Sequence, residues 1–244
     1  AASHRLRSPQ FSGPGKGLDK WFFYPGFTPD TGGLLRQPND TASTFDDGRI
    51  DWLARLGCTL RDGERVVTLF CYDNPALPQL LDYLAEQPTL LLATPGHAQR
   101  RLSGLQLPGA VRRFDLPWLT QADYDRLLRC ADLNLVRGED SFVRAMWAQR
   151  PFVWHIYPQD DGAHAYKLEA FLSSFAPAFD TATDADAWKA IQRAWNQLAP
   201  WPAHWPDNAA WVQACQSWCA GLVVQPDLCT QLQAFVHGIA DERR

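Results

Sequence analysis

The chain has 244 residues, which is long enough to bury a sizeable hydrophobic core in one or two domains. With 46% hydrophobic and 20% charged residues it has the composition of an ordinary globular protein. The net charge of −4 gives no reason to expect nucleic-acid binding, and no stretch approaches the roughly 20 apolar residues that a membrane span needs.

The first part of the chain predicts little regular structure. Residues 1–18 are polar and rich in Gly, Ser, Pro and Arg, as expected of a loop or of the remnant of a preceding domain. The bulky residues Trp21–Tyr24 are typical of a buried strand. A Gly-rich loop follows at Thr28–Gly33, where we expect exposed backbone amides, although a plain connection explains the loop equally well.

Strands then alternate with helices. Apolar periodicity predicts helices at 51–56, 75–85 and 121–130, and buried apolar runs predict strands at 65–72, 89–93 and 111–116. This alternation favours one Rossmann-like, doubly wound parallel sheet. Further helices are predicted at 165–175, 184–198, 208–223 and 226–240. We therefore expect one α/β domain over residues 19–244, with a helical last third.

Residues 132–161 are the most informative stretch. Leu133–Val136 predicts a strand, Gly138 permits a sharp turn, and Asp140 or Ser141 can cap a helix at 141–149. Pro151 ends that helix, and an apolar run predicts another strand at 152–156.

A turn of this kind directs backbone N–H groups and a positive helix end toward the carboxyl edge of a parallel sheet, where α/β proteins bind phosphates. The carboxylates of Glu139 and Asp140 repel phosphate but accept hydrogen bonds from sugar hydroxyls. The combination favours a sugar nucleotide over a bare triphosphate. An ordinary capped turn explains the pattern about as well.

Other loops that follow predicted strands should meet at the same edge of the sheet. A nucleotide needs an aromatic partner for its base, a donor–acceptor group for the base edge, and N–H groups for its diphosphate. The candidates for these contacts are Phe70, Tyr72, Trp118, Gln121, Glu139, Asp140 and Ser141.

Two long runs carry a resemblance to a known family. They are RGEDSFVRAMWAQRPFVWHIYPQDD at 137–161, continued by AHAYKLEAFL at 163–172, and WFFYPGFTPDTGGLLR at 21–36. Both closely resemble the bacterial elongation factor P arginine rhamnosyltransferase family, EarP. The resemblance covers nearly all of this chain, but only the second half of the family's protein.

The resemblance implies a fold and an activity. The family has a GT-B fold and transfers L-rhamnose from dTDP-β-L-rhamnose to an arginine of elongation factor P, inverting the anomeric centre. This chain would be the C-terminal, nucleotide-sugar-binding domain of a cytoplasmic enzyme. Its partners would be the nucleotide sugar and the acceptor protein, without nucleic acid, membrane, metal or further cofactor.

The resemblance also implies residue roles. Phe70 and Tyr72 would lie near the nucleotide, and Trp118 would stack on thymine where the family usually has Phe. Gln121 would read the thymine edge. Asp140 and Ser141 would belong to the donor-binding turn, with Glu139 as the residue taking part in catalysis.

The chemistry requires a base that this chain does not supply in a recognisable form. A guanidinium is cationic and a weak nucleophile, so a carboxylate must orient it and take its proton. In the family this base is an aspartate of the N-terminal domain, and no segment here matches that region. We therefore expect donor binding without transfer from this chain alone, whether it is a fragment or a separate product.

Other polar residues have simpler explanations. Asp184 and Asp186 form a D-x-D pattern, but at the start of a helix capping is favoured over metal binding. His155 and His164 flank the site loop and could touch phosphate, although packing is the more common role of such residues. Arg137 could neutralise phosphate, whereas Arg144 suits a surface salt bridge.

The six cysteines lie mostly within apolar segments, and none forms a C-x-x-C pair. Together with the lack of an apolar signal segment, this favours reduced, buried thiols and no zinc site. Two other functions remain open. The chain could be a degenerate glycosyltransferase half that only binds a protein partner, or part of a GT-B enzyme that uses another nucleotide sugar.

Overall fold

The computed structural model describes residues 6–37 and 48–241. The chain divides into two compact units, one formed by Ala1–Thr41 with Ala220–Arg244 and the other by Ala42–Cys219. This division differs from the expected one at residue 18, because the C-terminal segment joins the N-terminal one. The helix α8 (Asn208–Val223) contributes to both units.

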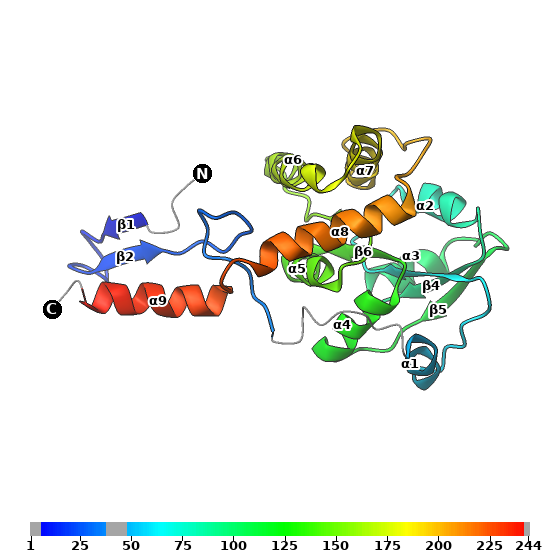
Figure 1. The fold of residues 1–244 in the computed structure, drawn as a ribbon, viewed down its shortest axis with the longest axis horizontal. Coiled ribbons are helices and arrows are strands. Elements are labelled where there is room, and N and C mark those ends of the chain that lie inside the picture. Colours follow the sequence, from blue (N-terminus) through cyan, green and yellow to red (C-terminus); the bar gives the residue numbers. More distant parts are fainter. Residues whose placement is uncertain (1–5, 38–47, 242–244) are drawn as a thin grey trace. The chain divides into compact units, whose positions relative to one another are not determined.

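The larger unit contains the predicted parallel sheet (Figure 1). Its strands lie in the order β5-β4-β3-β6-β7, and each neighbouring pair is parallel. Their bounds are β3 Arg65–Leu69, β4 Thr89–Ala93, β5 Val111–Asp115, β6 Leu133–Arg137 and β7 Phe152–His155. The α/β, Rossmann-like class is confirmed. The strand order reverses between β3 and β6, which is where folds of this kind bind ligands.

Helices cover the sheet on both faces, since all five residues of β4 are buried. The helices of this unit, besides α8, are α1 Arg49–Arg55, α2 Leu77–Leu84, α3 His97–Ser103, α4 Gln121–Cys130, α5 Gly138–Ala148, α6 Ala163–Phe175 and α7 Ala182–Trp195. An aromatic cluster packs α5, α6 and α7 against β7. Its rings are Phe142, Phe152, Trp154, Phe171, Phe175 and Trp188.

The junction between β6 and α5 differs from the prediction. The strand continues to Arg137 and the helix begins at Gly138, so no separate turn lies between them. Within the described chain, neither Asp140 nor Ser141 caps this helix, because both already lie inside its first turn. Gly138 makes the abrupt change of direction with a positive φ of 69°.

The smaller unit corrects two predictions. Residues expected to form a loop include strand β1 (Leu6–Pro9), which pairs antiparallel with β2 (Asp19–Phe22). The aromatic strand near Trp21 therefore belongs to a two-stranded ribbon and not to the parallel sheet. Trp21 and Phe23 contact Phe235 of α9 (Leu228–Asp241), with ring centroids 5.8 Å and 5.2 Å apart. Because Phe235 lies far from Trp21 and Phe23 in the sequence, no local sequence pattern predicts this contact.

On the outer side of the edge strand β7, backbone groups form hydrogen bonds with side chains of α7 and its C-cap. On α7, Gln192 accepts a hydrogen bond from Trp154 N (3.0 Å) and donates one to Phe152 O (2.9 Å). One turn later, Asn196 accepts from Ile156 N (3.0 Å) and donates to Trp154 O (2.7 Å). Both amides are buried, so each one satisfies a pair of backbone groups that water does not reach.

His155 at the end of β7 is 2% exposed and holds the loop that follows β3. The backbone N–H of Tyr72 donates to His155 Nδ1 (3.3 Å). Burial, reinforced by the nearby charge of Arg137, lowers the His155 pKa to about 4. The imidazole is therefore neutral at pH 7 and acts within the core. This role differs from the phosphate contact considered for it.

Gln192→Leu removes both hydrogen-bonding ends of one amide and leaves Trp154 N and Phe152 O unpaired in the core. We expect the free energy of unfolding to fall by about 2–4 kcal/mol, because each buried unpaired group costs roughly 1–3 kcal/mol. Urea denaturation measures the change. Asp186→Ala, on the exposed side of the same helix, should change stability by less than about 0.5 kcal/mol. Equal stability of the two variants would contradict the role given to Gln192.

The His155 pKa predicts a dependence of stability on pH. Between pH 6.5 and about 4 the unfolded chain binds a proton that the folded chain does not, so acidification destabilises the fold. From pH 7 to 4.5 this residue should contribute a loss of roughly 2 kcal/mol. His155→Asn keeps an acceptor for Tyr72 N but does not titrate. Denaturation curves at both pH values should therefore show a smaller loss in the variant, and an unchanged loss would argue against a neutral, buried His155.

Candidate functional site

A pocket of about 380 Å³ lies at the carboxyl edge of the sheet. Its walls come from segments that directly follow β3, β4, β5 and β6, so it lies at the point where the strand order reverses. Predicted site residues in its lining are Phe70, Trp118, Gln121, Asp140 and Ser141. The expected convergence of loops from separate strands is thus present in the structure. Tyr72 and Glu139 lie outside the lining.

Trp118 and Phe70 are the predicted residues that contribute aromatic rings to this pocket. The Trp118 side chain is 86% exposed, so its large apolar ring is free to contact a ligand. Phe70 is half-buried and contacts Tyr124 edge-on, with ring centroids 5.9 Å apart. The two rings therefore differ in burial, since Phe70 is packed and Trp118 is exposed to solvent.

Tyr72 lies beside the pocket, over the first turn of α5. A Cβ atom on Gly138 would lie 3.3 Å from the Tyr72 hydroxyl, so the two segments are in close contact. The guanidinium of Arg137 stacks on the rings of Phe70 (4.4 Å) and Tyr72 (4.8 Å). It also donates to Cys71 O (3.2 Å). Arg137 therefore holds the two aromatic residues in place, which is a different role from the phosphate contact considered for it.

The first turn of α5 brings Glu139, Asp140 and Ser141 to the same edge. No side chain of the described residues caps this helix, so its leading N–H groups are available to a ligand. Glu139 is exposed, and its charge contributes to the raised pKa of Tyr72, for which burial is the main cause. Ser141 is buried in the pocket wall. This end of the helix suits an anion, and the two carboxylates suit hydroxyl groups.

Arg144 is more deeply placed than predicted. It forms the expected ion pairs, through Nη1 with Asp125 (2.8 Å) and through Nε with Asp140 (2.8 Å). Its side chain is only 13% exposed and lines the pocket, so it is not a surface residue. Although burial disfavours the charged form, hydrogen bonds to the two carboxylates raise its pKa.

Tyr124 is a lining residue that the sequence reasoning missed. Burial raises the pKa of its hydroxyl, with the neighbouring Ser141 acting in the opposite direction. The phenol is therefore protonated at neutral pH. A signal was available, because Tyr124 follows Gln121 by one helical turn on α4 and so shares its face.

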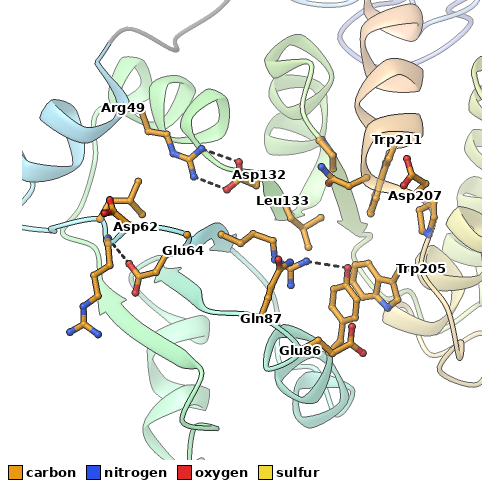
Figure 2. Close-up of a pocket in the computed structure, with 18 of the residues that line it drawn as sticks. Arg49, Asp62, Glu64, Glu86, Gln87, Asp132, Leu133, Trp205, Asp207 and Trp211 are labelled. Atoms are coloured by element: carbon orange, nitrogen blue, oxygen red, sulfur yellow. Dashed lines mark hydrogen bonds and ion pairs between the residues drawn. The ribbon is translucent and has the colours of Figure 1, made fainter.

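A larger cavity of about 950 Å³ lies at the opposite, amino edge of the sheet (Figure 2). There, Arg49 makes two hydrogen bonds to Asp132 (2.9 Å and 2.6 Å), which also accepts from Val66 N. Further carboxylates labelled in the figure are Asp62, Glu64, Glu86 and Asp207. Arg61 and Arg65 line the same cavity, so cations and carboxylates are mixed there. The carboxyl edge is the better candidate site, because the predicted site residues meet there at the point where the strand order reverses.

The remaining candidates have structural roles. Asp184 accepts hydrogen bonds from Thr181 at the start of α7 and from Asp207 N, and His164 accepts from Gln159 N. In the Gly-rich loop, Gly32 N donates to Tyr24 O (2.7 Å), so that amide is already occupied.

Among the described residues no three His, Cys, Asp or Glu side chains form a metal-binding group. All six cysteines are free, and five of them are buried as expected, whereas Cys229 is exposed. Within the same described ranges, no helix is long and apolar enough to cross a membrane.

Comparison with known proteins adds independent evidence. The family described as "Elongation-Factor P (EF-P) rhamnosyltransferase EarP" matches residues 1–237. The protein-arginine rhamnosyltransferase of Pseudomonas aeruginosa is 39% identical over 90% of this chain and 64% of the relative. That of Pseudomonas putida is 41% identical over 95% of this chain and 66% of the relative. The chain thus spans just under two thirds of these relatives.

A solved structure reported under "Structural basis for EarP-mediated arginine glycosylation of translation elongation factor EF-P" is 36% identical, with a TM-score of 0.75. The match covers 89% of this chain and 76% of that one. The family match, the identities and the shared fold agree, and the chain belongs to the EarP family of EF-P rhamnosyltransferases.

Proposed function

We propose that this chain is the donor-binding part of an inverting glycosyltransferase. It would take L-rhamnose from dTDP-β-L-rhamnose and serve its transfer to an arginine of elongation factor P in the cytoplasm. The observation that carries the proposal is the carboxyl-edge pocket, which places Phe70, Trp118 and Gln121 beside the uncapped first turn of α5. Membership of the family supports the same reaction.

Each part of the donor has a chemically matched group at this edge. The thymine would contact the rings of Trp118 and Phe70, with Gln121 at its polar edge. The diphosphate would accept hydrogen bonds from the N–H groups of the first helical turn and from the Ser141 hydroxyl. Glu139 and Asp140 would accept hydrogen bonds from hydroxyl groups of the sugars.

These contacts also suit the reaction. Negative charge develops on the departing diphosphate, and the N–H groups at the start of α5 stabilise that charge without reorganising. The acceptor guanidinium needs a carboxylate on the opposite face to orient it and take its proton. Our expectation that this chain alone binds the donor without transferring it stays a prediction.

Binding of dTDP tests the proposal directly. Titration calorimetry and Trp fluorescence should both detect dTDP, because the exposed Trp118 ring would stack on the base. Trp118→Ala should weaken binding roughly tenfold or more, as base stacking contributes about 1–3 kcal/mol. Tyr166→Ala removes an equally exposed ring from α6 and should leave dTDP binding unchanged.

Absence of any heat with a folded chain would overturn donor binding and favour the rival function, a module that only binds a protein partner. Tighter binding of GDP than of dTDP would instead favour an enzyme that uses another nucleotide sugar. The single titration series therefore separates all three readings.

Glu139→Ala tests the assignment of the sugar end. Glu139 is exposed in the first helical turn, so its loss should weaken dTDP-rhamnose binding roughly tenfold with an unchanged melting temperature. Binding of dTDP, which lacks the sugar, should change little. Equal weakening of both ligands would place Glu139 at the nucleotide, and an early-melting variant would show that its role is structural.

A further inference from the structure

We propose that Arg144 is a positioning residue that fixes the Gln121 amide so that it donates hydrogen bonds to the bound base. The pocket would then select a base with an exocyclic carbonyl, such as thymine or uracil, over one with an exocyclic amine at the same place, such as cytosine. This inference rests on the proposed function, since it concerns the base of the same donor.

The first step is the immobility of Arg144. Asp125 on α4 accepts hydrogen bonds from Nη1 with both carboxylate oxygens (2.8 Å and 2.9 Å). Asp140 on α5 accepts from Nε (2.8 Å). Two carboxylates from two helices therefore hold the planar guanidinium in one orientation. Its remaining nitrogen, Nη2, has a defined direction.

That nitrogen faces the amide of Gln121. A guanidinium has donors only, so hydrogen bonding assigns the Gln121 oxygen to the side that faces it. In this orientation the oxygen accepts from Nη2 and from Nε (3.2 Å to Nε). The reverse orientation would place an NH2 group against a cation that also donates. Because an unmade hydrogen bond to a charged group costs more than one between neutral groups, the amide has one preferred orientation.

A glutamine that is free to rotate can either donate or accept, and would not distinguish thymine from cytosine. Here the oxygen is occupied and the NH2 group remains for the pocket, which Gln121 lines together with Trp118. A donor matches the exocyclic oxygen of thymine and uracil. It opposes the exocyclic amine of cytosine, which is itself a donor. Since the Arg144 pKa is raised, this orientation is independent of pH in the working range.

The matched ligands dUDP and dCDP test the inference, since they have the same sugar and diphosphate but opposite groups at this position. Calorimetry on the full chain should find dUDP bound at least tenfold more tightly than dCDP. Gln121→Glu replaces the donor by an oxygen, and should lower the dUDP-to-dCDP affinity ratio at least tenfold. Equal affinities for both ligands in the unmodified chain would overturn the inference.

Two substitutions of Arg144 separate its positioning role from packing. Arg144→Met keeps the length of the side chain without donors and should move the affinity ratio toward one. Arg144→Lys restores a cationic donor, so it should retain most of the preference. The Lys variant should thus recover the selectivity that the Met variant loses. Equal dUDP-to-dCDP affinity ratios in the two variants would contradict the proposal. Melting temperatures would show that each variant is folded. Failure of dTDP to bind at all would instead overturn the proposed function itself.

Discussion

The abrupt passage from β6 into α5 is the constraint on which the carboxyl edge depends. The strand ends at Arg137 and the helix begins at the next residue, with the change of direction at Gly138. A Cβ atom there would lie 3.3 Å from the Tyr72 hydroxyl, in a backbone region that side chains disfavour. This junction directs the first turn of α5 toward the pocket. It also fixes where Glu139 and Ser141 lie relative to the carboxyl edge of the sheet.

Two arginines support this arrangement from either side. Arg137 stacks on Phe70 and Tyr72, so the loop after β3 is held against the start of α5. Arg144, about two turns further along, joins α5 to α4 through Asp125. In both cases a cation that sequence patterns assign to solvent or phosphate instead fixes neighbouring side chains. The groups that contact a ligand are thereby separated from the groups that position them.

Local signals explain what could be predicted. Continuous apolar runs such as Val66–Leu69 and Leu90–Ala93 identify buried parallel strands, and chain order then leads to the α/β class and to its ligand-binding edge. The pairing of β1 with β2 and the packing of Phe235 on Trp21 were not predictable, because their partners lie far apart in sequence. A glycine at 138 is typical of a turn, so the sequence predicts a helix start at 141, three residues after the start of α5 in the structure.

The amides of α7 have a consequence for the behaviour of the protein at high concentration. The outer strand of an open sheet is a template on which a second molecule can add a strand, which leads to aggregation. Gln192 and Asn196 already form hydrogen bonds with backbone groups on the outer side of β7, where such a strand would add. The backbone groups of Phe152, Trp154 and Ile156 that these amides occupy are therefore not available to a strand of another molecule.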